Sequence, residues 1–340
     1  MMPYRREESD VPVSNSLPNL RVLPTKKKVN KGVGKLIEYF KGWKYVLRHA
    51  QKFDIIHIEW LSLLDYIGIE LILIRSLLKK NPKVTYTVHD VTPLHDAGEK
   101  TIDRFSELYR IIPAIIVHSC FARNELIKTF NVKPEKVYIH DLAPLLAESD
   151  NQEAPSERTR VGIIGTLSPY KGVFDAIRAY ALIAGKIREN LLLAGGISHE
   201  HKNQVQRLIR ELNIDNKVTL IGRYLTIQEV IDLHKTIKVI LLPYHRITQS
   251  GAALTSLSLG VPVVAYDVGA MAEMIENGKT GYIVPPQNIE ALSNAVLNIL
   301  NNDTVDFHTN CKQYAQSKSW GLIAEQTIQT YESLLTKSNG

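Results

Sequence analysis

Short apolar runs alternate with longer amphipathic stretches along most of this 340-residue chain. The runs hold four or five residues each, as buried strands do, whereas most of the stretches between them have helical spacing. Repeated strand–helix alternation favours parallel sheets with helices on both faces. The expected strands are Asp54–Ile58, Val84–Val88, Ala114–His118, Lys136–Ile139, Val161–Gly165, Leu191–Ala194, Val218–Ile221, Val239–Leu242, Val261–Ala265 and Gly281–Val284.

A polar segment without periodicity, Glu148–Thr159, separates two groups of these strands and is predicted to be a linker. We therefore expect an α/β chain with two doubly wound, Rossmann-like domains, residues 1–150 and 151–310, which face a cleft. Residues 311–340 are predicted to pack back toward the first domain. They belong to a helical pattern from His308 to Leu335 that has Trp320 in its middle.

The beginning of the chain lacks the strand and glycine turn that usually open a doubly wound domain. Residues 1–20 are polar, and the first apolar fragment, Leu20–Leu23, runs straight into lysines. Two interpretations stay open: the N-terminal domain is abbreviated, or the chain is a truncated form of a longer protein.

Composition excludes several classes of protein. Hydrophobic residues make up 44% and charged residues 22% of the chain, which are ordinary globular values. Cys120 and Cys311 have neither disulfide nor metal-ligand spacing and fit a reducing compartment. Because the N-terminus lacks an apolar core and Tyr66–Leu78 carries charges, we expect no signal peptide, no membrane span and a cytoplasmic location.

The net charge is +6, and much of the excess comes from basic residues between 26 and 48. Without an aromatic stacking motif, zinc spacing or helix-turn-helix signal, an anionic membrane surface on the cytoplasmic face is a better partner than nucleic acid. Val33–Ala50 has apolar residues on one helical side and basic residues on the other. That spacing fits an in-plane membrane helix, or a helix that covers the sheet with its basic face in water.

The segment Leu242–Ala265 predicts an anion site. Its strand ends at Pro243, and after a polar loop Ser250-Gly251 opens an alanine- and leucine-rich helix. Serine caps helix starts, glycine lets a ligand approach the backbone, and the helix N-terminus attracts phosphate.

A second loop of this kind, Gly165-Thr166-Leu167-Ser168-Pro169-Tyr170-Lys171-Gly172, lies between a strand and a helix. A cation such as Lys171 is unfavourable at a helix start unless an anion is near, so we interpret it as a phosphate clamp rather than a solvated surface lysine. The loop is not a P-loop, because the lysine precedes the glycine and no Ser or Thr follows.

Three other strand ends carry polar groups with open interpretations. His89 could bind a sugar hydroxyl, or it could merely pack in a loop that Asp90 caps. His57 alternates with apolar residues, a pattern that is at least as typical of a structural role as of a functional one. His118 and Ser119 could reach the cleft, or Ser119 could cap the helix Phe121–Phe130. The turn Gly222-Arg223-Tyr224 could offer backbone groups to a base and Arg223 to an anion, or it could simply be an exposed turn.

A set of segments occurs together: G-T-L-S-P-Y-K-G, L-L-L-A-G-G, the Gly222 turn, P-Y-H-R-I-T-Q-S-G…L-G-V-P-V-V-A-Y-D-V-G-A-M-A-E, G-K-T-G-Y-I-V and Trp320. This set resembles the retaining GT-B glycosyltransferases of glycosyltransferase family 4, also called group 1. The match covers most of the chain from Asp54 and is strongest from Val161 to Val284.

The resemblance implies transfer of a sugar from a nucleotide-diphosphate sugar, such as a UDP- or GDP-sugar, to a hydroxyl of a glycan or lipid-linked acceptor. The configuration is retained, and neither a metal nor another cofactor is required. Lys171 matches the diphosphate-binding lysine, and His89 matches a histidine near the donor sugar. The implied donor site comprises Gly165, Thr166, Lys171, Arg223, Tyr224, Gln249, Ser250, Gly251, Ala252 and Thr255.

Three positions depart from the family pattern. Thr166 stands where an arginine is usual, and Ile247 and Thr255 replace two glutamates. The T-Q-S-G form resembles a branch of the family in bacterial polysaccharide assembly. These departures and the short N-terminus keep open an inactive relative that serves as a binding subunit. Another GT-B-like enzyme on nucleotide sugars, such as an epimerase, is a further alternative, which the lack of acidic residues in the loop 244–256 disfavours.

Overall fold

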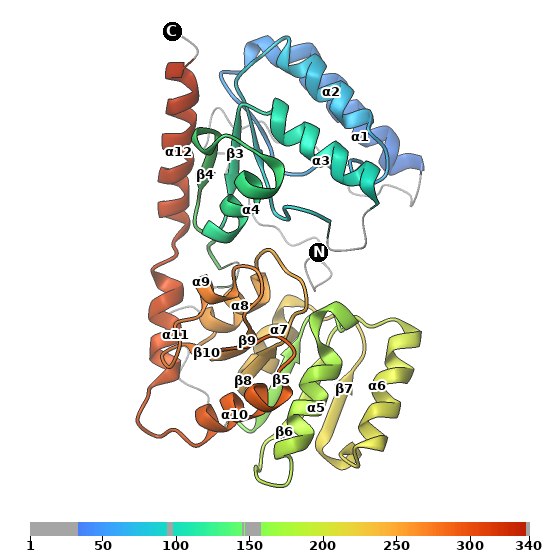
Figure 1. The fold of residues 1–340 in the computed structure, drawn as a ribbon, viewed down its shortest axis with the longest axis vertical. Helices are drawn as coiled ribbons and strands as arrows, with labels where there is room; N and C mark the ends of the chain where they lie inside the picture. Colours follow the sequence, from blue (N-terminus) through green and yellow to red (C-terminus); the bar gives the residue numbers. More distant parts are fainter. Residues whose placement is uncertain (1–32, 94–97, 145, 147–157, 338–340) are drawn as a thin grey trace. The chain divides into compact units, whose positions relative to one another are not determined.

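The computed structural model describes residues 33–93, 98–144, 146 and 158–337, which divide into two compact units. The N-terminal unit comprises the described residues of 33–117, 123–139 and 326–337. The C-terminal unit comprises residues 118–122 and the described part of 140–325. Figure 1 shows the elements of both units, and each unit is described by itself.

The N-terminal unit is built on a four-stranded parallel sheet with the strand order β1-β2-β3-β4. Sequential order along a parallel sheet requires a crossover between successive strands, and each of the three crossovers contains a helix. The strands are β1 (Ile56–Ile58), β2 (Val84–Thr87), β3 (Ala114–Val117) and β4 (Val137–Ile139). The helices are α1 (Val33–His49), α2 (Ile69–Leu78), α3 (Glu99–Ile111) and α4 (Cys120–Phe130).

Strands β2 and β3 are buried along their whole length, which explains their continuous apolar or threonine-containing sequences. Helix α3 packs its buried Tyr109 ring edge-on against Phe130 of α4, and the Tyr109 hydroxyl donates to the Val91 carbonyl. Helices α1 and α2 pack against each other, but Leu36 and Ile37 on α1 stay 43% and 50% exposed.

The C-terminal unit contains a six-stranded parallel sheet with the order β10-β9-β8-β5-β6-β7. Strands β6 and β7 therefore lie on one side of β5, and the later strands β8, β9 and β10 lie on its other side. The strands are β5 (Arg160–Ile164), β6 (Asn190–Ala194), β7 (Val218–Ile221), β8 (Ile237–Leu242), β9 (Val263–Tyr266) and β10 (Gly281–Val284).

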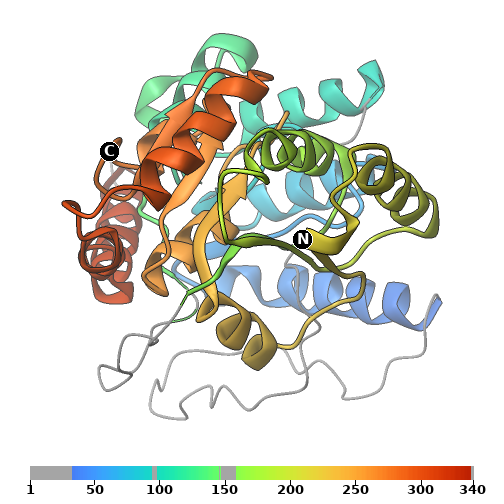
Figure 2. The ribbon, with the colours of Figure 1, turned by 90° about the horizontal axis from the view of Figure 1, so that it is seen from below.

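Helices cover both faces of this sheet, as the alternation predicts. One apolar cluster joins the sheet to α5 (Val173–Ile183), α6 (His199–Glu211) and α10 (Ile289–Leu300), which lie over the same face in Figure 2. A second cluster joins the opposite face to α7 (Ile227–His234), α8 (Gly251–Ser258) and α11 (Phe307–Gln316). The short helix α9 (Met271–Met274) adds Met271 to the second cluster.

The helical pattern from His308 to Leu335 does not form one helix. It is interrupted at residues 317–319, and Trp320 begins a separate helix, α12 (Trp320–Lys337). At this break Ser317 donates from its hydroxyl to the Tyr314 carbonyl, and Ser319 accepts from the Leu322 amide. The expectation of a continuous helix with Trp320 in its middle was wrong, because these serine side chains satisfy backbone groups at a helix end.

All ten expected strands are present, with boundaries that differ by at most two residues. Of the two roles left open for Ser119, the structure shows the cap, since its hydroxyl accepts from the Ala122 amide at 3.0 Å. Residues 1–32 and most of the predicted linker lie outside the described residues. Within the described ranges, no helix combines the length and hydropathy that a membrane crossing needs.

Candidate functional site

The strand order of the C-terminal unit reverses at β5, because the chain leaves β5 toward β6 on one side and comes back to β8 on the other. Ligands of open α/β sheets bind outside the carboxyl ends of the strands at such a switch point. The two loops that follow β5 and β8, residues 165–172 and 243–250, are the two loops predicted to bind an anion.

These two loops are packed together. The His245 amide donates to the Tyr170 carbonyl at 2.8 Å. Gly172 adopts a φ of +69°, and a Cβ at this position would lie 1.8 Å from the Pro243 carbonyl oxygen. Only glycine therefore fits where the first loop meets the second.

Tyr244 connects the two predicted anion-binding groups. Its buried ring lies under the Lys171 ammonium, with Nζ 5.3 Å from the ring centroid. Its hydroxyl accepts from the Ser250 hydroxyl at 3.4 Å. Lys171 and the start of α8 consequently contact the same side chain.

The start of α8 has the geometry of an anion site. The Ser250 hydroxyl caps the helix by accepting from the Ala253 amide at 3.1 Å. A helix leaves its first amides without intrahelical acceptors, so those of Gly251 and Ala252 stay oriented outward from the N-terminus. Apart from its chain neighbours and the backbone of its own helix, no described atom lies within 4 Å of the position that a Cβ on Gly251 would take, so the space beside this residue is open.

The loops after β6 and β7 extend the same edge of the sheet. The Leu167 amide donates to the Gly196 carbonyl at 2.8 Å, and a Cβ on Gly196 would lie 2.9 Å from the Tyr224 ring. Tyr224 is nevertheless 57% exposed, so its ring covers Gly196 on one side and faces solvent elsewhere.

Among the described residues, two buried acceptors on the anion-binding loops lack a hydrogen-bond donor. They are the hydroxyl oxygen of Ser168 and the side-chain carbonyl oxygen of Gln249. A buried polar atom without a partner is destabilising unless a water or a ligand satisfies it. Both loops therefore carry a polar atom that a ligand hydroxyl or amide could use.

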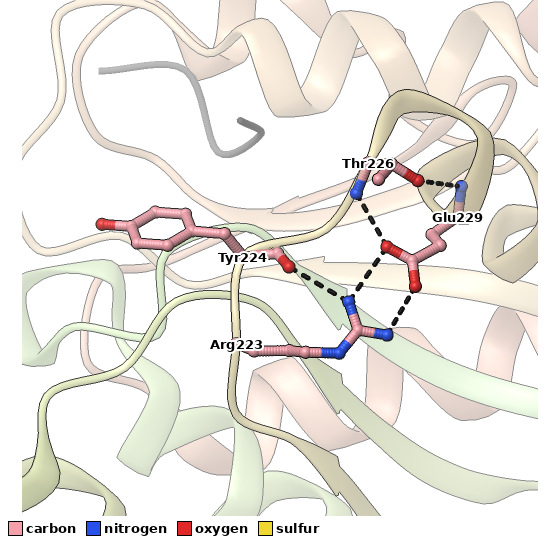
Figure 3. Close-up of polar contacts among 4 residues, drawn as sticks. All are labelled: Arg223, Tyr224, Thr226 and Glu229. Carbon is pink, nitrogen blue, oxygen red and sulfur yellow. Dashed lines mark hydrogen bonds and ion pairs between the residues drawn. The ribbon is translucent and has the colours of Figure 1, made fainter. Parts of the chain in front are cut away.

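Arg223 is held by a carboxylate rather than left for a ligand. Figure 3 shows its guanidinium in a two-point contact with Glu229, and it also donates to the Tyr224 carbonyl at 3.1 Å. Glu229 and Thr226 form the capping box of α7, with the Thr226 amide donating to Glu229 at 2.8 Å. Hydrogen bonding from Arg223 lowers the pKa of Glu229 to about 2.

The positions that depart from the family pattern lie in different surroundings. Thr166 is partly buried in the first loop, and Thr255 is buried on α8 one turn beyond its start. Ile247 packs against the apolar cluster around α7, α8 and α11, and its carbonyl oxygen lies 2.0 Å from where a Cβ on Gly269 would be. A glutamate at 247 would therefore have to leave an apolar environment.

Sequence reasoning missed a network beside Lys171. Asp175, in the first turn of α5, accepts from His245 Nε2 at 2.8 Å and from the Tyr266 hydroxyl at 3.2 Å. This contact fastens the loop after β8 to the helix that follows the first loop. An acidic residue in a first helical turn and a histidine after a strand end are each visible in the sequence, but their pairing is not.

The N-terminal unit has a polar cluster of its own at the carboxyl ends of β1 and β2. His57 lies on β1, with Nε2 2.7 Å from the Thr87 hydroxyl, 3.2 Å from a Glu59 oxygen, and Nδ1 2.6 Å from the Tyr331 hydroxyl of α12. The second Glu59 oxygen lies 3.3 Å from His89 Nε2. The structure thus places predicted His89 beside Glu59, which the sequence reading did not single out.

Burial lowers the pKa of His57, although Glu59 opposes the shift. A neutral His57 that accepts from Tyr331 at Nδ1 carries its proton on Nε2, where it faces Thr87 and Glu59. Partial burial raises the pKa of Glu59, but the hydrogen bond from His89 and the nearby His57 and Thr87 outweigh it and lower the pKa below its usual value. The cluster therefore holds an ionised carboxylate between two imidazoles.

No group of three or more His, Cys, Asp or Glu side chains within the described ranges has a metal-binding arrangement. Beside the anion-binding loops, the Lys171 ammonium and the dipoles of the outward amides of α8 supply positive potential.

Comparison with known proteins gives two matching families. Residues 147–318 match the family described as Glycosyl transferases group 1, and residues 5–140 match Glycosyltransferase Family 4. An N-acetyl-alpha-D-glucosaminyl L-malate synthase from Bacillus anthracis is 22% identical over 311 residues, which cover 85% of this chain and 77% of the relative. A D-inositol 3-phosphate glycosyltransferase from Corynebacterium urealyticum is 26% identical over 184 residues, which span 52% of this chain and only 43% of the relative.

Solved structures show the same fold. A sucrose-phosphate synthase from Thermosynechococcus elongatus superposes with a TM-score of 0.70 at 21% identity, covering 89% of this chain and 78% of that one. Anabaena HepE in complex with UDP-glucose gives a TM-score of 0.66 at 18% identity, covering 86% of this chain and 82% of that one. The two Rossmann-like parallel-sheet units thus have the architecture of GT-B glycosyltransferases.

Proposed function

Because the chain belongs to the group 1 glycosyltransferases, we propose that it transfers a sugar from a nucleotide-diphosphate sugar to a hydroxyl acceptor with retention of configuration, in polysaccharide or glycoconjugate synthesis. The observation that carries the proposal is the convergence of Lys171 and the start of α8 on Tyr244 at the switch point. The UDP-glucose complex of Anabaena HepE supports a donor of this class.

The chemistry depends on stabilising the leaving diphosphate. Negative charge develops on this group as the bond to the sugar breaks, and oriented cations and N–H dipoles lower the energy of that state. We assign this role to Lys171 and to the amides of Gly251 and Ala252, whose orientation is fixed by the Ser250 cap. With Thr166 in place of an arginine, Lys171 carries a larger share of the charge.

The remaining donor contacts are assigned along the same sheet edge. Gly165 and Thr166 open the first loop, Gln249 offers its unsatisfied carbonyl oxygen to a donor hydroxyl, and Thr255 stands behind the helix start. The turn Arg223-Tyr224 is assigned to the nucleotide base, with the exposed Tyr224 ring as the contact and Arg223 as the group that orders the turn through Glu229. In the N-terminal unit, His89 is assigned to the transferred sugar.

The acceptor is proposed to be a glycan or lipid-linked hydroxyl, and neither a metal nor a cofactor enters the proposed scheme. The T-Q-S-G loop supports a place in the polysaccharide-assembly branch. The N-terminal unit is also proposed to contact anionic membrane on the cytoplasmic face. The support is that Lys41, Lys44 and Arg48 on α1 are exposed together with Leu36 and Ile37.

Lys171→Ala tests the proposal. It should lower turnover at least tenfold, because removing one donor from a developing anion typically costs about 3 kcal/mol. Lys186→Ala is the matched control, since Lys186 is exposed after α5 at the opposite edge of the sheet. Unchanged turnover in Lys171→Ala would remove the site assignment.

Nucleotide titration tests the activity class. Wild-type protein should bind UDP or GDP with a dissociation constant well below millimolar, and Lys171→Ala should weaken this binding. If neither nucleotide binds better than about millimolar, the proposed transferase activity is wrong and an inactive relative is left.

A further inference from the structure

The cluster around Glu59 is more than an ion pair at a strand end. Both carboxylate oxygens are engaged, one by His57 at 3.2 Å and one by His89 at 3.3 Å, yet the Glu59 side chain is 62% exposed. An ionised carboxylate has about four lone-pair positions, so each oxygen can accept another hydrogen bond from solvent or a ligand. The two histidines fix the direction in which these acceptors point.

An exposed indole lies directly next to this carboxylate in the chain. Trp60 is 57% exposed, and its ring lies 5.1 Å from the His89 ring at an interplanar angle of 38°. The contact with His89 orients Trp60 while much of its surface stays open to solvent. A rigid aromatic surface with a polar group beside it is typical of binding sites that need contact area at low entropic cost.

This pair of groups matches the surface of a sugar ring. A pyranose has a face of C–H groups that can lie against an indole, and a rim of hydroxyls that donate to a carboxylate. A phosphate would be repelled by Glu59. A cationic ligand would also suit an indole and a carboxylate, but the two imidazoles already offset part of the Glu59 charge.

We infer that Trp60 and Glu59 form a carbohydrate subsite at the carboxyl end of β1, so that the acceptor of this protein is recognised as a pyranoside. The inference rests on the proposed function, which supplies the hydroxyl acceptor, and it narrows the acceptor class to sugars. Trp60 provides the stacking surface, and Glu59 accepts the ring hydroxyls. His57 is a positioning residue for Glu59, and His89 holds the second Glu59 oxygen in addition to the role assigned to it above.

Binding of simple glycosides tests the subsite without the donor. Saturation-transfer NMR on the full chain would use methyl α-D-glucopyranoside, methyl α-D-mannopyranoside and N-acetylglucosamine, with glycerol and tetramethylammonium as probes of other chemistry. At least one pyranoside should bind wild-type protein. Trp60→Ala should weaken that binding about tenfold and Glu59→Gln about threefold, whereas Trp60→Phe should retain intermediate affinity because it keeps a ring.

Trp320→Phe is the matched control. Trp320 is also 57% exposed, but it lies in the C-terminal unit and its indole donates to the Pro144 carbonyl. Its pyranoside affinity should equal that of wild type. The inference is overturned if no pyranoside binds, if Trp60→Ala binds like wild type, or if tetramethylammonium binds and the sugars do not.

Nucleotide binding separates this inference from the proposed function. UDP or GDP titration reports on the C-terminal unit, and Trp60→Ala and Glu59→Gln should leave it unchanged. Nucleotide binding without pyranoside binding would overturn the subsite alone, whereas pyranoside binding without nucleotide binding would overturn the transferase and keep the subsite. In turnover assays with a sugar acceptor, Trp60→Ala should raise the acceptor KM more than it lowers kcat.

Discussion

The carboxyl edges of the two sheets offer different chemistry on related folds. At the edge of the C-terminal sheet, glycines bring backbone close to backbone, and Lys171 and a helix start contribute positive potential. At the edge of the N-terminal sheet, the polar groups come from side chains: the Glu59 carboxylate lies between two imidazoles, and the exposed Trp60 indole lies beside one of them. Backbone amides bind an anion only when close packing orients them toward it. Sugar hydroxyls can instead donate to acceptors on side chains, such as a carboxylate.

Gly172→Ala should break the C-terminal edge most severely. Its φ of +69° and the 1.8 Å approach of a Cβ to the Pro243 carbonyl leave no room for a side chain. We expect a loss of about 3 kcal/mol in unfolding free energy, measured by urea denaturation, together with loss of nucleotide binding.

Gly185→Ala is the control, because no described atom beyond its chain neighbours lies within 4 Å of its added Cβ. Hydrogen exchange near Glu59 should be the same in both variants if the two edges are independent. A Gly172→Ala protein as stable as wild type would contradict the claim that backbone packing builds the C-terminal edge.

A buried acid should give the N-terminal unit a pH dependence. Glu70 on α2 is buried, accepts from the Leu63 amide at 3.1 Å, and has a pKa that burial raises to about 7. Because the pKa of Glu70 is raised in the folded state, its protonated form contributes fully to the stability of the fold below pH 4.5. This contribution is lost as the pH rises through 7. Unfolding free energy should therefore fall by about 2 kcal/mol between pH 5 and pH 8.

Glu70→Gln has the shape of the protonated acid and should remove this part of the pH dependence. Hydrogen exchange of the segment 61–78, followed at both pH values, would locate the effect in the N-terminal unit. If the unfolding free energy has the same pH dependence in wild type and Glu70→Gln, the folded-state pKa of Glu70 is not raised.

Ser250→Ala should separate capping from ligand binding. Loss of an N-cap typically costs about 1 kcal/mol, and Asn288→Ala on α10 should cost as much, because Asn288 caps the Ala291 amide in the same way. Only Ser250→Ala should also weaken nucleotide binding in calorimetry, by about threefold. An equal loss of affinity in both variants would point to general destabilisation instead.

The smallest effect is expected from Glu229→Gln. The Arg223–Glu229 pair is exposed, so stability should change little. Because Arg223 orders the Tyr224 turn through Glu229, weakening this contact should lower nucleotide affinity about twofold. A rise in affinity at low salt that disappears at high salt would instead mean that Glu229 holds Arg223 away from an anionic ligand.

The strands were predictable because each is a short apolar run with a polar end, and this signal is local. The capping box of α7 was equally readable, since Thr226 and Glu229 have the S/T-x-x-E spacing. The sequence left Arg223 open between an anion contact and an exposed turn, and its pairing with Glu229 was not predicted. The break before α12 was not predicted, because residues 317–319 contain neither glycine nor proline.

Glu59 was not predicted as a site residue for a different reason. It looks like an ordinary polar position after an apolar run, and its partner His89 lies 30 residues further along the chain. Their contact depends on the pairing of β1 with β2, in which Ile58 lies opposite Tyr86. The same holds for Asp175 and His245, which meet because β5 and β8 are neighbours.

The sequence by itself determined which segments become strands and helices and which chemical groups stand at the strand ends. Local periodicity is enough for that, because it reflects which face of each element is buried. Only the tertiary structure decided which ends meet: that Lys171 and Ser250 contact one tyrosine, and that Glu59 lies between two histidines. Those meetings depend on strand order and register, which are set by packing between segments far apart in the chain.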